Sequence, residues 1–151
     1  MTRPMMGGKL GLHYFLRMMR EIRLPSRIES VDEAAIQADE FAKAQGFPED
    51  FVSAIDLAIR ESVANAVKHG NKFDESKEVE VTFADSPETF EITVRDHGDG
   101  FDVDEIPDPT NPENLLKASG RGILFMNAFM DEVSWSNHQS GGMVVRMVKK
   151  R

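Results

Sequence analysis

Hydrophobic and polar residues alternate with a period of two in three stretches of the first hundred residues, and this alternation predicts β-strands. The stretches are residues 21–24, which end before Pro25, residues 78–83 and residues 90–95. A turn at Ser86-Pro87 separates the last two stretches. We therefore expect one short opening strand and, later in the chain, a pair of neighbouring strands.

Two apolar stripes with helical spacing lie between the first and second predicted strands. The first predicts a helix that begins at a cap, Ser30 or Asp32, and runs to about Gln45, where Gly46 ends it. The second predicts a helix over about residues 49–69, which follows a proline and ends at a Gly-Asn pair.

The last third of the chain begins with a long segment rich in proline and glycine, residues 98–119, which is typical of a functional or disordered loop. A helix over residues 123–130 and a hairpin of strands 132–137 and 143–149 follow it. This order predicts an α+β fold, a two-layer α/β sandwich. Its sheet is expected to be mixed but mostly antiparallel and covered by helices on one face.

The predicted domain organisation is simple. Residues 20–151 are expected to form one domain, preceded by an N-terminal extension over residues 1–19. The extension is either disordered or a short amphipathic helix, because Leu12, Phe15 and Leu16 have helical spacing. A start codon further downstream is another explanation for it.

Composition and charge narrow the function. The 151 residues carry 18 basic and 26 acidic side chains, a formal net charge of −8, whereas proteins that bind nucleic acid directly usually present a basic surface. Cysteine is absent, which excludes disulfides and thiolate chemistry and is compatible with a cytoplasmic location. No run approaches the roughly 18 apolar residues of a membrane span, so we expect no membrane partner.

The second predicted helix carries the first candidate site. Glu61 and Asn65 are four residues apart and therefore share one helix face, where their neighbours are Ala54, Leu57 and Ala58. A carboxylate that can accept a proton would lie beside an amide oxygen suited to Mg²⁺. A plain solvated face is the alternative, but such a face more often carries long polar side chains.

Two glycine-containing turns are the other candidates. Asp96 ends a predicted strand and is followed by Gly98 and Gly100, a pattern that lets a ligand approach the backbone while the carboxylate accepts from an amino group such as that of adenine. Gly120 and Gly122 open the predicted helix of residues 123–130, where free N–H groups attract phosphate. Each turn taken alone is also common without any ligand.

The order of these motifs resembles the GHKL (Bergerat-fold) ATPases, and within them the anti-sigma factor serine/threonine kinases. The resemblance rests on Glu61-Ser-Val-Ala-Asn65-Ala, Lys68-His-Gly, Asp96-His-Gly-Asp-Gly-Phe, Ser119-Gly-Arg-Gly-Ile and Met130-Asp-Glu-Val, and it spans about residues 20–149. It implies a protein that binds ATP and Mg²⁺, phosphorylates an anti-sigma factor antagonist on Ser or Thr, and sequesters a sigma factor. It also implies homodimerisation.

The resemblance implies roles for the matching residues. Glu61 would be the general base and Asn65 the Mg²⁺ ligand. The adenine pocket would be formed by Asp96, Gly98 and Gly100, and the phosphates would be held by Gly120, Gly122 and Arg121, although Arg121 can equally face solvent.

One departure and two alternatives remain. The family usually has Gly-Thr near the end of the fold, with a hydroxyl that helps to bind phosphate, whereas Met143 follows Gly142 here. That change favours the alternative of an anti-sigma binding module with weak or no ATP hydrolysis. A sensor histidine kinase would need a phosphoacceptor on a helical hairpin, and His13 has no such hairpin around it.

Overall fold

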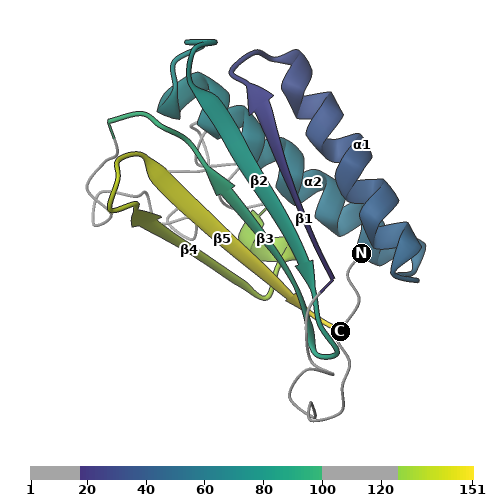
Figure 1. The fold of residues 1–151 in the computed structure, drawn as a ribbon. Helices are drawn as coiled ribbons and strands as arrows, with labels where there is room; N and C mark the ends of the chain where they lie inside the picture. Colours follow the sequence, from purple (N-terminus) through teal and green to yellow (C-terminus); the bar gives the residue numbers. More distant parts are fainter. Residues whose placement is uncertain (1–17, 100–125) are drawn as a thin grey trace, which may run out of the picture.

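The computed structural model describes residues 18–99 and 126–151, and within them five strands form one sheet in the order β1-β2-β3-β5-β4. All four neighbouring pairs are antiparallel, so the described sheet has no parallel pair. The strands are β1 (Met18–Pro25), β2 (Glu78–Asp85), β3 (Thr89–Arg95), β4 (Glu132–Asn137) and β5 (Met143–Lys150). Figure 1 shows them side by side.

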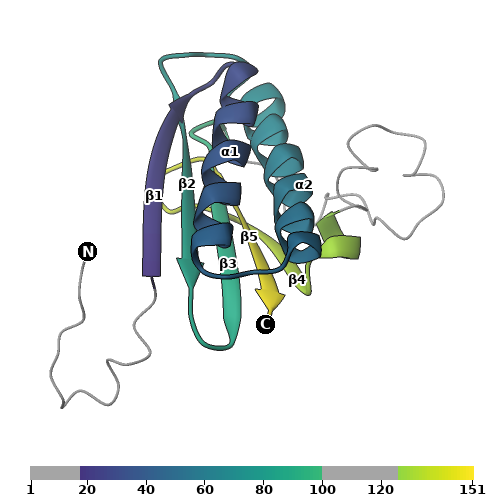
Figure 2. The same ribbon diagram turned by 90° about the vertical axis from the view of Figure 1, so that its right-hand side faces the viewer.

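Two helices cover one face of this sheet, as the view along the sheet edge shows (Figure 2). They are α1 (Glu29–Ala44) and α2 (Glu49–Asn65), and α2 continues into a π-helical turn, η2 (Ala66–Gly70). Residues 126–129 are also helical. The predicted α+β two-layer sandwich, with a largely antiparallel sheet covered on one face, is confirmed.

The core lies between the sheet and the helices. The apolar stripe of α2 packs there, since its predicted core positions Ile55, Ile59 and Val63 are fully buried. Opposite them lie the inward-facing residues of the strands, among which Phe83 and Phe90 are the largest fully buried side chains. Burying side chains of this kind contributes roughly 2–3 kcal/mol each, so the helix layer is held mainly by apolar packing.

Helix α1 starts differently from the sequence expectation. Its N-cap is Ile28, which makes no side-chain capping bond, and Ser30 instead donates its hydroxyl to the carbonyl oxygen of Pro25 at 2.7 Å. The predicted caps Ser30 and Asp32 are therefore wrong, because Ser30 is used to tie the helix to the end of β1. The predicted stop is confirmed: Gly46 has a left-handed φ of 84°.

The N-terminal end of the described chain begins earlier than expected. Met18 and Met19, assigned by the sequence to the extension, belong to β1 and pair with Asp85 and Ala84. The amphipathic helix considered for the extension lies otherwise outside the described residues, as does His13.

Candidate functional site

Glu61 and Asn65 lie on the flank of α2 that faces away from α1. The α1 side of α2 is marked by Arg60, which contacts Asp32 of α1 at 2.6 Å. Glu61 and Asn65 are turned away from that contact by roughly 100° and 140° around the helix axis. Both are half-buried. Ala54 and Ala58 on the same flank are buried, so these two polar groups are not part of an open solvent face.

Helix α2 widens after Asn65, because residues 66–70 form a π-helical turn rather than a further α-helical turn. π-helical turns inside or at the end of an α-helix are rare and are often found at functional sites. At the end of this turn Gly70 lies directly against Asp96, because a Cβ built on Gly70 would overlap the Asp96 carboxylate. The helix that carries Glu61 and Asn65 therefore ends against Asp96, the residue that a separate sequence motif indicates as a ligand-binding carboxylate.

Asp96 follows β3 and is only 2% exposed. Its Oδ1 accepts the backbone N–H groups of Gly98 at 2.9 Å and Met143 at 3.1 Å. None of the hydrogen bonds among the described residues uses Oδ2, the atom beside Gly70. Oδ1 thus fixes the carboxylate, and Oδ2 has no partner within residues 18–99 and 126–151.

The backbone around Asp96 is packed so closely that it requires glycine at three points. A Cβ on Gly98 would overlap the carbonyl oxygen of Gly70, and one on Gly142 would overlap the carbonyl oxygen of Asp96. Gly142 also has a left-handed φ of 86°. Three segments distant in sequence, residues 70, 96–98 and 142–143, therefore meet at one carboxylate.

Met143 belongs to this end of the site. Its backbone is bonded to Asp96 twice, because Met143 N donates to the carboxylate and Asp96 N donates to Met143 O at 3.0 Å. The sequence raised Met143 as a substitution affecting phosphate binding. The structure places it beside the carboxylate expected to read the base, and both of its hydrogen bonds with Asp96 use main-chain atoms of Met143.

The structure brings together Asp96, Gly98 and the C-terminal end of the helix that carries Glu61 and Asn65. The other predicted site residues, Gly100, Gly120, Arg121 and Gly122, lie outside the described residues. Their grouping with the base pocket stays a prediction. Among the described residues, no group of three or more His, Asp and Glu side chains is placed to hold a metal.

The described part of the site fits an adenine nucleotide in its chemistry. Among the described residues, Oδ2 of Asp96 has no hydrogen-bond partner and could accept from an amino group, and the glycines at positions 70, 98 and 142 bring backbone close to Asp96. Asn65 supplies an amide oxygen of the kind that Mg²⁺ accepts as a ligand.

Asn71 is a residue that the motif search missed. It is 2% exposed, although it directly follows η2 and the sequence marks it only as part of the helix stop. Its Oδ1 accepts the backbone N–H of His97 at 2.7 Å, and its Nδ2 donates to Ser26 Oγ at 2.7 Å and to the carbonyl oxygen of Glu78 at 3.1 Å. The only sequence feature that could have indicated Asn71 is its place directly after Gly70, the glycine that ends the helix.

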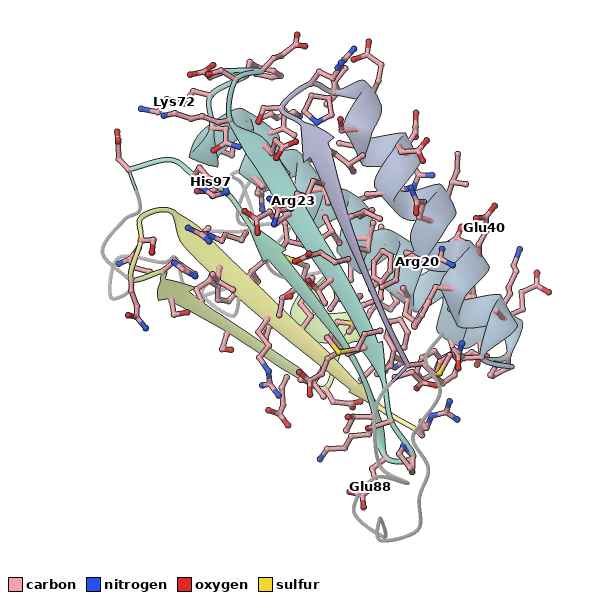
Figure 3. The ribbon with its side chains drawn as sticks, viewed as in Figure 1. Arg20, Arg23, Glu40, Lys72, Glu88 and His97 are labelled. Carbon is pink, nitrogen blue, oxygen red and sulfur yellow. The ribbon has the colours of Figure 1, made fainter. Side chains whose placement is uncertain are left out.

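His97 extends this network to the open face of the sheet. Its Nε2 lies 2.5 Å from Glu80 Oε2, and Figure 3 shows His97 at the end of the sheet opposite Glu88. Burial of Glu80 opposes its ionisation, but the hydrogen bond and charge of His97, with the charges of Arg23 and Arg95, outweigh this and lower the pKa of Glu80. The contact with Glu80 therefore gives His97 a structural role, and no catalytic role is needed to explain its presence.

A second polar cluster lies between the helices, away from Asp96. Asp39 of α1 and Asp56 of α2 line a hollow of about 460 Å³ together with Lys43, Phe47, Glu49, Val52 and Ser53. Burial, followed by the charge of Asp56 and a hydrogen bond with it, raises the pKa of Asp39 to about 6. Lys43 and Arg60 act in the opposite direction.

The family of the chain follows from comparison with known proteins. The histidine kinase-like ATPase domain family matches residues 24–149. The serine-protein kinase RsbW of Bacillus subtilis (strain 168) is 30% identical over 135 residues, which cover 85% of this chain and 83% of that protein. The anti-sigma F factor of Anoxybacillus flavithermus is 36% identical over 104 residues, covering 66% of this chain and 70% of that protein.

Solved structures with the same fold include the RsbU and RsbW domains of Rv1364c from Mycobacterium tuberculosis, with a TM-score of 0.65 at 21% identity. That match covers 89% of this chain and 33% of the other. The SiaB-SiaC complex from Pseudomonas aeruginosa gives a TM-score of 0.66 at 12% identity and covers 89% of this chain and 90% of the matched chain. At these identities the structures support the fold alone.

The chain thus belongs to the histidine kinase-like (GHKL) ATPase domains. Within that class it is a member of the anti-sigma kinase family. The resemblance inferred from the motifs is confirmed. No helix in the two described segments has the length and apolar character needed to cross a membrane.

Proposed function

We propose that this protein is an anti-sigma factor kinase that binds Mg-ATP, phosphorylates an antagonist protein on Ser or Thr, and sequesters a sigma factor. The observation that carries the proposal is the half-buried pair of Glu61 and Asn65 on a helix whose end packs against Asp96. The names of two relatives, a serine-protein kinase and an anti-sigma F factor, support both halves of the activity.

Each side chain has a separate task in this proposal. Asp96 accepts a hydrogen bond from the amino group of adenine through Oδ2 and thereby fixes the base end of the nucleotide. Asn65 contributes its amide oxygen to Mg²⁺, which would offset negative charge on the phosphates. Glu61 accepts the proton of the substrate hydroxyl as its oxygen bonds to the γ-phosphorus of ATP. The bond between that phosphorus and the oxygen that bridges it to the β-phosphate breaks, and ADP leaves with the bonding electrons.

The kinase activity is tested with radiolabelled ATP, Mg²⁺ and purified antagonist proteins encoded in the same genome. The wild-type protein should label one antagonist on Ser or Thr, located by mass spectrometry. Glu61→Gln should lower the rate by about 100-fold or more while nucleotide binding is retained, since a positioned base contributes roughly 10²–10⁴. Glu49→Gln, an exposed acid on the first turn of the same helix, is the matched control.

The alternative is a binding module that keeps partner recognition without phosphate transfer. Capture of partners by the wild-type protein and by Glu61→Gln, each with and without Mg-ATP, separates the two. Binding of a sigma factor without labelling of any antagonist would support the binding module and contradict the kinase proposal.

A further inference from the structure

Asn71 joins four segments of the chain through one carboxamide. Its Nδ2 donates to the hydroxyl oxygen of Ser26, which follows β1, at 2.7 Å. It also donates to the carbonyl oxygens of Lys77 and Glu78, at the start of β2, at 3.3 and 3.1 Å. His97, which follows β3, donates its N–H to Oδ1 at 2.7 Å. Asn71 itself continues from η2, so the end of the helix layer is tied to the ends of three strands.

The two ends of this carboxamide have different partners. The Nδ2 end donates to the fully buried Ser26 and to the two carbonyl groups at the start of β2. The Oδ1 end holds the peptide group between Asp96 and His97. A carboxamide combines two N–H donors with an acceptor oxygen on one short side chain, which suits these two sets of partners.

Asn71 therefore restrains Asp96 from two sides. On one side, the residue directly before it is Gly70, whose Cα packs against the Asp96 carboxylate. On the other side, it fixes the N–H of His97, the residue directly after Asp96. No hydrogen bond of Asn71 goes to Asp96 itself, so the effect on that carboxylate is indirect.

We propose that Asn71 is a positioning residue for nucleotide recognition, one that holds Asp96 in the orientation that selects an amino group on the base. The inference rests on the proposed function, in which Asp96 binds adenine. Asn71 touches neither the nucleotide nor the substrate. Its loss lets the turn of residues 96–98 relax, and Oδ2 of Asp96 then no longer stays aligned with the base.

The test compares the affinities of the full-length protein for ATP and GTP by isothermal titration calorimetry. Adenine carries an amino group where guanine carries a carbonyl oxygen, so Asp96 favours ATP. Asn71→Ala should weaken ATP binding about tenfold, leave GTP binding within about twofold, and so reduce the preference for ATP. Asn71→Asp, which keeps an acceptor oxygen for the His97 N–H, should retain more of that preference than Asn71→Ala.

Ser26→Ala is the matched structural control. It removes one of the three acceptors of Nδ2 from the same buried network and leaves the His97 bond intact. It should lower the thermal unfolding midpoint, as Asn71→Ala does, but keep the preference for ATP. Equal loss of preference in both variants would mean that Asn71 acts through stability alone and would overturn the inference. If Asn71→Ala does not fold, Asn71→Ser, which also cannot reach His97, is measured in its place.

The outcomes separate this inference from the proposed function. A wild-type protein that prefers ATP, with an unchanged preference in Asn71→Ala, overturns the positioning role only. A wild-type protein that prefers ATP but labels no antagonist overturns the kinase proposal only. A wild-type protein with no preference for ATP overturns the base-reading role of Asp96 and with it the inference.

Discussion

Gly70 packs its Cα against the carboxylate of Asp96, and this contact joins the end of the helix layer to the end of β3. Any side chain at residue 70 would have to displace the carboxylate or the π-helical turn. The helix with Glu61 and Asn65 and the carboxylate of Asp96 are therefore set relative to each other by a residue that has no side chain.

Gly70→Ala should weaken ATP binding by at least about tenfold, because the added methyl group would overlap Asp96 Oδ2. The fold should also lose about 1–3 kcal/mol of stability from the forced shift. Calorimetric titration with ATP and urea denaturation measure the two effects. Lys68→Ala, an exposed position in the same turn, is the control, and ATP binding by Gly70→Ala equal to that of the control would contradict the expectation.

Asn65→Ala should reduce the affinity for ATP about tenfold in the presence of Mg²⁺ and have little effect in EDTA, since the amide oxygen acts through the metal. The measurement is the ATP dissociation constant under both conditions. An equal loss with and without Mg²⁺ would show that Asn65 contacts the nucleotide or the fold instead of the metal.

Asp39 makes stability depend on pH. Its pKa is raised from 3.8 to about 6 in the folded protein, so between these values the folded state binds the proton more tightly than the unfolded chain. Its contribution to stability is therefore full below about pH 4 and is lost as the pH rises through 6. Asn at this position removes the ionisation.

Asp39→Asn should accordingly stabilise the protein at pH 7, because no carboxylate then has to ionise in a partly buried place beside Asp56, and should change stability little at pH 4. Screening by solvent reduces the gain to about 1–2 kcal/mol. Urea denaturation between pH 4 and pH 8 tests this. Glu40→Gln, the exposed neighbouring acid on α1, should leave the pH profile unchanged. A profile for Asp39→Asn that runs parallel to the wild type would exclude Asp39 as its source.

Arg151 follows β5 and binds the end of β2. It pairs with the buried Asp85 through two bonds of 3.2 and 2.7 Å, and its guanidinium lies 4.3 Å from the ring centroid of Phe47. Arg151→Ala should cost about 1–2 kcal/mol by urea denaturation, because Asp85 is left buried without its partner. Arg151→Lys should recover only part of this, since a lysine cannot make the paired contact. Lys150→Ala, whose side chain is exposed, is the control.

The sequence predicts the strands and helices of this fold because their apolar periods are long and regular, as at Ile55, Ile59 and Val63. It places Glu61 and Asn65 on one face of α2 and Asp96 directly after β3, because helical spacing and the end of an alternating stretch can be recognised locally. It does not predict the cap of α1, where a bond from Ser30 to Pro25 displaces the local preference for capping. The role of Asn71 is not predicted either, because it depends on contacts that only the folded chain makes. Ser26 and His97 are 45 and 26 residues away from it, and the carbonyl groups of Lys77 and Glu78, 6 and 7 residues away, are brought to it by the pairing of β2 in the sheet.

The π-helical turn of residues 66–70 fixes how many residues this segment can contain. A π-helical turn accommodates one residue more than an α-helical turn of the same rise. Deleting a single residue there would restore a regular helix, rotate the following glycine by roughly a quarter of a turn, and separate it from the strand end it now meets. Insertions and deletions in this segment should therefore be far less tolerated than substitutions of its exposed side chains, and related chains that keep the site should keep its spacing.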